Sequence, residues 1–357
     1  MSHLVTHLSQ RHAIRLLTFE SKTTAPFYEL PPSVDYLKTD RLGRGLRRAW
    51  RIASRPSTIR RQVKAFAPDA IISFTDTTNI TTVLACLGLK VPVIISERID
   101  PSQYRIGWAK DFLRARTYPR ARLIVVPSSR VAEYFPASLQ LKIRIIGNPI
   151  QVSPLAAGPP GEGSDRRRVI AVGRYEPQKG FDLLLDAFAL IANAYPDWDL
   201  LIIGEGPERS RLEAQARRLQ LGARVTLKGV VPDVFKELIS SHLMASTSRY
   251  EGFPNALAEG LAVGLPAVGF SGVSGVEDLI IHEKTGLLVD QRDGAAGFAR
   301  ALSKLMGDRQ LRAAAGEAAL EHIRRWAPDH VFDLWEDALA EAVSSRIEGD
   351  ASRPGRL

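Results

Sequence analysis

Cysteine is nearly absent from this sequence: Cys86 is the single thiol among 357 residues, and its neighbours are apolar. One cysteine excludes a disulfide or a thiolate metal site within one chain, and an apolar setting is typical of a small core residue, not of a nucleophile. Long hydrophobic runs are absent too, and the first residues lack the pattern of a signal peptide. These absences argue against a membrane-spanning helix and predict a cytosolic protein.

Acidic residues are scarce in the first half of the chain. Residues 1–160 hold 24 Lys and Arg against 10 Asp and Glu, a net charge of +14, whereas the remainder holds 24 against 29, a net charge of −5. A basic half joined to an acidic half indicates two partners of different kinds, the first of them anionic. No recognition-helix or zinc-finger pattern is present, so nucleic acid is not the expected partner.

Apolar strand signals alternate with helix-length segments, which is typical of parallel sheets covered by helices on both faces. The length of 357 residues suits two such domains. We therefore predict an α/β protein with a first domain over 1–150, a linker over 151–165, a second domain with C-terminal helices over 166–347, and a disordered tail over 348–357. A loop is expected from 20 to about 40. The expected strands are 14–19, 70–74, 91–96, 123–127, 143–146, 169–172, 200–203, 225–227, 243–246, 266–270 and 286–289.

The stretch from Arg249 to Gly264 is the most informative part of the sequence. It predicts a strand end, a tight loop broken by glycine and proline, and a helix capped by Asn255. The free N–H groups of the first helical turn and the helix dipole favour an anion such as phosphate there. Glu251 precedes the cap and Glu259 lies about one turn into the helix, so we expect both carboxylates to bind neutral hydroxyls of one ligand.

Cations and glycines follow the earlier strands of the second domain. Arg174 comes directly after the strand-ending Gly173, and Lys179 precedes the next helix, so side-chain charge and backbone N–H groups together predict a diphosphate clamp. Gly204 lies in a tight turn after the following strand, and the backbone at Val231 could hold the flat edge of a base. Each signal is weak alone, because a glycine-rich turn is most often merely a turn.

Together these segments resemble the donor half of retaining GT-B glycosyltransferases of family four. The resemblance rests on Val172-Gly173-Arg174, Lys179-Gly180, Ile203-Gly204-Glu205-Gly206, Glu251-Gly252-Phe253-Pro254-Asn255 and Glu259. It implies the GT-B fold, in which two Rossmann-like domains face a cleft, and it implies a nucleotide-sugar donor.

The resemblance also implies a role for each matching residue. Arg174 and Lys179 would bind the diphosphate, Glu259 the ribose hydroxyls, and Glu251 the hydroxyls of the transferred sugar. Arg174, Lys179 and Glu251 are then the catalytic residues. The donor-binding set is Gly173, Arg174, Lys179, Gly204, Val231, Glu251, Gly252, Phe253, Pro254, Asn255 and Glu259.

The first half departs from the family in two places. The family's usual opening strand and glycine-rich loop are missing, because Met1 falls where its first helix is already under way. We therefore expect a gap in the first sheet, and a truncated sequence or a mis-assigned start. The strand end that often carries a histidine reads Ser96-Glu97-Arg98-Ile99-Asp100, as in members that build bacterial polysaccharides on polyprenyl-diphosphate carriers. Glu97, Arg98 and Asp100 are therefore the candidates for acceptor binding or for a base.

A basic amphipathic helix is predicted shortly before the second expected strand. Arginines recur there at helical spacing, while Leu46, Trp50 and Ala53 fall on the other side. This pattern favours contact with an anionic membrane surface or with a lipid-linked diphosphate. A solvated charged face is the competing interpretation. The arginines concerned are Arg44, Arg47, Arg48, Arg51 and Arg55.

The sequence as a whole predicts a retaining glycosyltransferase that moves a sugar from a nucleotide-diphosphate sugar to a hydroxyl of a lipid-linked or polysaccharide acceptor, and UDP is the expected nucleotide. No cofactor and no metal are expected, because the two cations would neutralise the diphosphate. Two alternatives stay open: a nucleotide-sugar epimerase or hydrolase of the same fold, and a non-catalytic nucleotide-sugar-binding subunit. The expected place of action is the inner face of the cell membrane.

Overall fold

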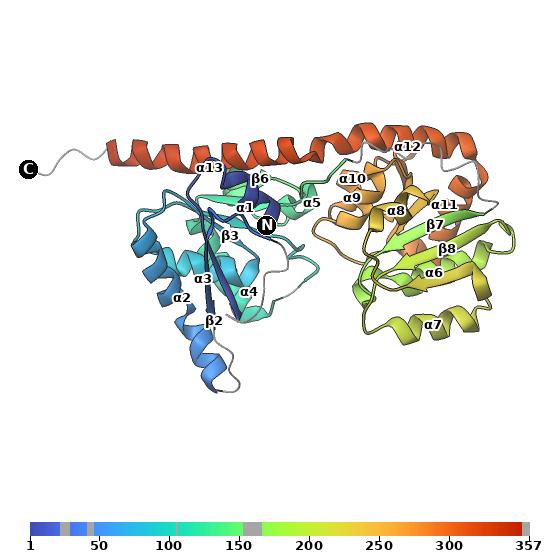
Figure 1. The fold of residues 1–357 in the computed structure, drawn as a ribbon, viewed down its shortest axis with the longest axis horizontal. Coiled ribbons are helices and arrows are strands. Elements are labelled where there is room, and N and C mark those ends of the chain that lie inside the picture. The colour runs from blue at the N-terminus through green and yellow to red at the C-terminus, as the bar shows by residue number, and fades with distance from the viewer. Residues whose placement is uncertain (22–28, 41–45, 105, 153–165, 352–357) are drawn as a thin grey trace, which may run out of the picture.

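The computed structural model describes residues 1–351 except 22–28, 41–45, 105 and 153–165, and of residues 21, 40, 46–52 and 345–351 it describes the backbone alone. The paired strands in this part of the chain are parallel and form three sheets (Figure 1). The first half holds a two-stranded and a four-stranded sheet, and the second half a six-stranded sheet. This arrangement confirms the predicted α/β fold class.

The four-stranded sheet organises the first half, in the order β3-β4-β5-β6. Alternate residues of its central strands enter different cores. Ile95 and Ile124 pack with α3, whereas Ile94 and Leu123 pack with α1 and with the C-terminal helix. The elements are α1 (Ser2–Leu8), β1 (Arg15–Ser21), β2 (Asp35–Asp40), α2 (Leu46–Phe66), β3 (Ile71–Phe74), α3 (Asp76–Cys86), β4 (Val93–Ser96), α4 (Trp108–Thr117), η1 (Tyr118–Arg120), β5 (Leu123–Val126), α5 (Ser129–Glu133), η2 (Ala137–Lys142) and β6 (Ile143–Ile145).

The six-stranded sheet of the second half has the order β12-β11-β10-β7-β8-β9, so the chain changes direction between β7 and β10. In such sheets ligands bind beyond the carboxyl ends of the strands at this point. The elements are β7 (Arg167–Val172), η3 (Pro177–Lys179), α6 (Phe181–Ile191), β8 (Trp198–Ile203), α7 (Arg209–Arg218), η4 (Gly222–Arg224), β9 (Val225–Lys228), α8 (Val234–Ile239), β10 (Leu243–Ser246), α9 (Asn255–Ala262), β11 (Ala267–Phe270), α10 (Val276–Leu279), β12 (Gly286–Val289), η5 (Gln291–Asp293), α11 (Gly294–Gly307), α12 (Arg309–Ile323), η6 (Arg324–Trp326) and α13 (Pro328–Ala351).

Every strand expected from the sequence is present, with ends shifted by at most two residues. The expected loop before residue 40 is wrong at its end, because β2 occupies Asp35–Asp40 and pairs with β1. The prolines at 31 and 32 indicated a loop, and the short strand that follows them was therefore not predicted. Its Tyr36 and Thr39 have side chains that favour strands. An ion pair of 2.6 Å between Arg15 and Asp35 joins the two strands.

The first half has a divided sheet. The strands β1 and β2 pair with each other, and in the part of the chain that the structure describes no strand links them to β3. The expected missing strand stays a prediction. Cys86 lies in the core of this half, where burial raises the pKa of its thiol to about 11, as expected for a structural cysteine.

The C-terminal helix α13 packs on the first half of the chain. The sequence had suggested that it belongs to the second domain. Trp335 and Ala338 of α13 pack with Leu4 of α1 and Ile94 of β4, and Figure 1 shows the helix lying along the first half. Its backbone remains helical to Ala351, beyond the expected end at 347, and 352–357 lie outside the described residues. Helix α6 ends at Ile191.

Candidate active site

The loop between β10 and α9 leaves the six-stranded sheet next to β7, at the point where the strand order reverses. The predicted cap of α9 is wrong by one residue: Pro254 is the cap and Asn255 is the first helical residue. The side chain of Asn255 is engaged elsewhere, because its Oδ1 accepts a hydrogen bond of 2.7 Å from Nδ2 of Asn148 in the first domain. The first turn of α9 still presents backbone N–H groups that have no acceptor within the helix.

Gly252 lets this loop lie directly on the first domain. A Cβ atom there would come within 2.2 Å of the backbone oxygen of Arg98, closer than real Cβ contacts. Gly275 meets the same loop from the other side, at a φ of +77°, and a Cβ atom on it would lie 2.7 Å from Pro254. Phe253 is buried and packs on Trp326. Close backbone contacts therefore fix the shape of the loop.

Glu251 and Lys179, which the sequence assigned to different parts of one ligand, form an ion pair. The Nζ atom of Lys179 lies 2.5 Å from Oε1 of Glu251, and the hydroxyl of Ser248 donates a hydrogen bond of 2.8 Å to the same oxygen. Both contacts use Oε1, and the side chain of Glu251 is 8% exposed. Sequence reasoning missed Ser248, although it lies three positions before Glu251.

Arg174 lies more openly than Lys179. Its side chain is 70% exposed and forms an ion pair of 2.8 Å with Glu176, a residue that the sequence analysis did not single out. Gly173 makes room for the lysine, because a Cβ atom there would lie 3.1 Å from the lysine side chain. Arg174 can therefore turn towards an anion at the cost of an exposed ion pair, which contributes little in water.

Two further predicted donor residues lie around the ends of β8 and β9. Gly204 has a φ of +149°, and a Cβ atom on it would overlap the backbone oxygen of Gly173 at 1.9 Å. The glycine thus permits backbone packing between two loops, whatever it binds. Val231 is half-buried and packs against the core of the second domain.

Glu259 lies on the second turn of α9 and is half-buried. Burial raises the pKa of its carboxyl. Among the described residues no hydrogen-bond or ion-pair partner is found for it. A desolvated carboxylate without a partner is costly unless a ligand supplies donors.

A pocket joins several of these residues. It is lined by the ends of β7 and β10, by Lys179 and Glu251, and by the first turn of α9. A cation, a carboxylate and helical N–H groups therefore converge beyond the carboxyl ends of two neighbouring strands. This combination can bind a phosphate and the hydroxyls next to it.

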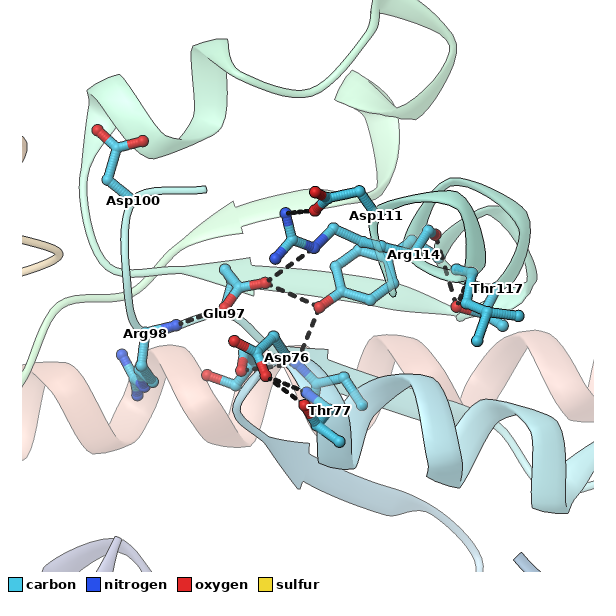
Figure 2. Close-up of polar contacts among 12 residues, drawn as sticks. Asp76, Thr77, Glu97, Arg98, Asp100, Asp111, Arg114 and Thr117 are labelled. Atoms are coloured by element: carbon cyan, nitrogen blue, oxygen red, sulfur yellow. Dashed lines mark hydrogen bonds and ion pairs between the residues drawn. The ribbon is translucent and has the colours of Figure 1, made fainter. Parts of the chain in front are cut away.

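The first-domain candidate Glu97 is enclosed within a polar cluster (Figure 2). It is 2% exposed, its Oε2 accepts a hydrogen bond of 2.8 Å from the hydroxyl of Tyr118, and it lies 3.9 Å from Nε of Arg114. Burial raises the pKa of Glu97, and the tyrosine and the arginine act against that rise. Sequence reasoning missed Tyr118 and Arg114, since no motif spacing links them to Glu97.

Arg98 and Asp100 are also engaged. The guanidinium of Arg98 lies over the rings of Phe74 and Trp335, 5.5 and 5.9 Å from their centroids, and burial lowers its pKa to about 10. Asp100 is 1% exposed and accepts hydrogen bonds from Ser102 and from Ser274 of the second domain. Asp100 therefore joins the two domains at the cleft.

A second cross-domain contact lies beside the first. The hydroxyl of Ser129 donates a hydrogen bond of 2.6 Å to Asp278, and Arg130 forms an ion pair of 3.5 Å with Glu277. The carboxyl ends of both sheets therefore face each other, as a cleft between two Rossmann-like domains requires.

Comparison with known proteins identifies the family. Residues 157–322 match the family described as Glycosyl transferases group 1, and residues 1–153 match Glycosyltransferase Family 4. A solved Anabaena protein, HepE in complex with UDP, has the same fold, with a TM-score of 0.71, 20% identity and coverage of 81% of each chain. The chain belongs to the GT-B glycosyltransferases.

Curated relatives of this glycosyltransferase act on bacterial glycans. A Campylobacter jejuni N-acetylgalactosaminyltransferase, named for an undecaprenol-diphosphate-linked substrate, is 27% identical over 96% of this chain and 94% of its own. An exopolysaccharide phosphotransferase of Streptomyces coelicolor is 29% identical over 96% of this chain. The glycosyltransferase spans 39% of that longer protein.

The predicted basic helix of the glycosyltransferase is present as the first part of α2. Arg44 lies outside the described residues, as do the side chains of Arg47, Arg48 and Arg51. The guanidinium of Arg55 lies 4.6 Å from the ring centroid of Phe19, so it contacts the protein. Within the described ranges, no helix has the length and apolar character needed to cross a membrane.

The glycosyltransferase contains one Asp-x-Asp pair, Asp197 and Asp199. Both lie at the start of β8, at the opposite end of the strand from the pocket. Asp197 forms an ion pair with Arg167, and Asp199 with Arg166 and Arg224. In the described part of the chain, no group of three or more His, Cys, Asp or Glu residues is placed to hold a metal.

Proposed function

We propose that this glycosyltransferase is a retaining hexosyltransferase that uses a UDP-linked sugar and a hydroxyl of a lipid-linked glycan. The pocket between β7, β10 and α9 carries the proposal, because Lys179, Glu251 and the helix N-terminus converge there. The names of the relatives support the two substrates: one solved neighbour binds UDP, and one relative is named for an undecaprenol-linked acceptor.

In the proposed reaction, the bond between the anomeric carbon and the diphosphate oxygen breaks while the acceptor oxygen bonds to that carbon on the same face. The departing diphosphate takes the acceptor proton, so UDP leaves and the anomeric configuration is retained. The main demand on the protein is stabilisation of the charge that develops on the leaving group.

Positive groups at the pocket meet this demand. Lys179 and Arg174 would bind the diphosphate, and the N–H groups of α9 would donate hydrogen bonds to it. When Lys179 turns to the phosphate, Glu251 is released to bind hydroxyls of the sugar. Glu259 would bind the ribose hydroxyls, which supply the donors that its carboxylate lacks.

The two first-domain carboxylates are poorly placed to act as a base, which supports the diphosphate as the group that takes the acceptor proton. Glu97 is hydrogen-bonded to Tyr118, and Asp100 to Ser102 and Ser274, and both are almost fully buried. Neither presents a free oxygen to an acceptor in this arrangement. The guanidinium of Arg98 lies over the rings of Phe74 and Trp335, and Arg98 would support the loop on which the acceptor lies.

The proposed chemistry needs no metal, because the cations of the pocket neutralise the diphosphate. Chelation with EDTA should therefore leave turnover nearly unchanged. The proposed place of action is the cytoplasmic face of the cell membrane, where a nucleotide sugar and a lipid-linked acceptor can both be reached. Peripheral binding to that surface is part of the proposal.

The test is turnover of a UDP-sugar with and without a polyprenyl-diphosphate-linked acceptor, with the anomeric configuration of the product read by NMR. The proposal expects UDP release that depends on the acceptor and a product with the configuration of the donor. UDP release without acceptor would favour the hydrolase alternative. UDP binding without any turnover would favour the non-catalytic subunit, and an inverted product would exclude retention.

A further inference from the structure

Helix α4 carries its apolar side chains outward. Trp108 is 87% exposed, Phe112 55% and Leu113 38%, whereas Arg114 and Thr117 are buried. An amphipathic helix of a water-soluble domain normally has the opposite orientation, with its apolar face on the core. A cluster of exposed aromatic residues on one helix marks a surface that another body covers.

The inward polar face of α4 is explained by the buried carboxylate behind it. Arg114 lies 3.9 Å from Glu97 and 3.4 Å from Asp111, and the hydroxyl of Thr117 donates to the backbone of Leu113. Of these contacts the one with Glu97 leaves the helix, so it sets which side of α4 faces inward, and Figure 2 shows Arg114 directed towards Glu97. The aromatic residues are therefore held outward and cannot turn to the core.

The exposed face combines aromatic rings with a cation. Trp108, Phe112 and Arg116 follow each other at intervals of four residues and so form one row along the helix. The guanidinium of Arg116 lies 5.0 Å from the centroid of the Phe112 ring. Asp111, the one acid of the helix, pairs with the buried Arg114. The face thus offers positive charge without a free carboxylate.

We propose that this face of α4, made of Trp108, Phe112, Leu113 and Arg116, docks on an anionic lipid bilayer. The proposal rests on the proposed function, since a lipid-linked acceptor keeps its enzyme at the membrane. The two rings enter the boundary between head groups and acyl chains, and the guanidinium of Arg116 contacts lipid phosphates. An anionic bilayer suits this face better than an apolar protein groove, because Arg116 needs an anionic partner.

The position of α4 suits that role. The loop that leads into the helix begins at Asp100, which contacts Ser274 of the second domain at the cleft. A bilayer under α4 would therefore lie beside the carboxyl ends of both sheets. An acceptor glycan could then pass from the lipid surface to the pocket without leaving its carrier.

The first experiment measures co-sedimentation of the full chain with phosphatidylcholine vesicles that contain or lack phosphatidylglycerol. The double change Trp108→Ser with Phe112→Ser should lower the partition coefficient on the anionic vesicles by about tenfold or more. Leu190→Ser, which alters a residue 64% exposed on α6, is the matched control and should change nothing. Calorimetry with UDP on the same variants should be unaffected, which separates this surface from the donor site.

The second experiment compares α4 with the basic part of α2 through fluorescence quenching by brominated lipids. Trp198 and Trp335 are buried and Trp326 packs on Phe253, so Trp108 and Trp50 are the tryptophans to compare. Trp108→Phe should abolish most of the quenching, and Trp50→Phe should leave it intact. Quenching lost in Trp50→Phe alone would overturn the proposal and assign the contact to α2.

Three results would contradict the docking of α4 on lipid. They are absence of parent binding to anionic vesicles, unchanged binding by the double variant, and self-association of the parent that the double variant abolishes without a change in vesicle binding. None of these depends on turnover. Failure of the UDP experiments with intact vesicle binding would instead count against the proposed function.

Discussion

Glu97 and Glu251 offer a comparison within the molecule, because each follows a buried parallel strand and each meets a cation and a hydroxyl. Glu97 meets Arg114 and Tyr118, which come from a helix and a turn that cover it. Glu251 meets Lys179 and Ser248 at the edge of a pocket. Similar groups thus form an enclosed cluster in the first domain and line a small pocket in the second.

The helix that follows each carboxylate makes the difference. After Glu251 the chain turns within a few residues into α9, whose N-terminus faces the pocket. After Glu97 the chain makes a longer loop, and α4 then returns with Arg114 directed inward. A carboxylate near a helix N-terminus and an open pocket can exchange its partners for a ligand, whereas an enclosed one serves stability.

The largest expected effect comes from Glu251→Gln. The change removes the partner of Lys179 and the acceptor for sugar hydroxyls, so kcat should fall by about 100-fold, while the urea midpoint stays close to that of the parent. Glu283→Gln, at an exposed carboxylate paired with Lys304, is the control and should leave both quantities unchanged. A variant that keeps parental turnover would remove Glu251 from the site.

Tyr118→Phe should have the opposite effect to Glu251→Gln, with lower stability and unchanged UDP binding. It deprives buried Glu97 of a hydrogen-bond donor, so the free energy of unfolding should fall by about 1 to 3 kcal/mol. Urea unfolding gives this quantity, and calorimetry should show parental affinity for UDP. Lost turnover with unchanged stability would break the comparison, because Glu97 would then belong to the chemistry.

A smaller effect concerns pH. Burial raises the pKa of Glu97 above its ordinary value of 4.5, so the folded state holds this proton more firmly than the unfolded chain. The stability that this group contributes is complete below pH 4.5 and is lost as the pH rises through the raised folded value. Glu97→Gln should remove this component, which urea unfolding of the two proteins over a pH series can measure. Identical pH profiles would contradict the assigned environment.

The sequence predicted the strands well, because buried parallel strands give unbroken apolar runs. The site stays a prediction, but its residues Lys179, Glu251 and Glu259 could be chosen from the sequence because they follow strand ends. The ion pair between Lys179 and Glu251 could not, since it depends on the side-chain geometry of two distant loops. The pattern at 97–100 also gave no sign that α4 would enclose Glu97.

The rotation of α4 was equally hidden. Its sequence alternates aromatic and basic residues, and only the ion pair of Arg114 with the buried carboxylate decides which of them faces outward. The return of α13 to the first domain depends on Trp335 reaching the core around Ile94. Such long-range packing carries no local pattern, so helix periodicity alone could not reveal it.

Calorimetric titration of UDP into the parent, Lys179→Ala, Glu259→Ala and the control Lys304→Ala tests the central claim that the pocket between β7, β10 and α9 is the donor site. Loss of one charge-assisted contact costs roughly 1.5 to 3 kcal/mol, so each of the two site variants should bind UDP about tenfold to more than a hundredfold more weakly, with an unchanged melting temperature. Lys304→Ala should bind like the parent. Parental affinity in both site variants would contradict the account.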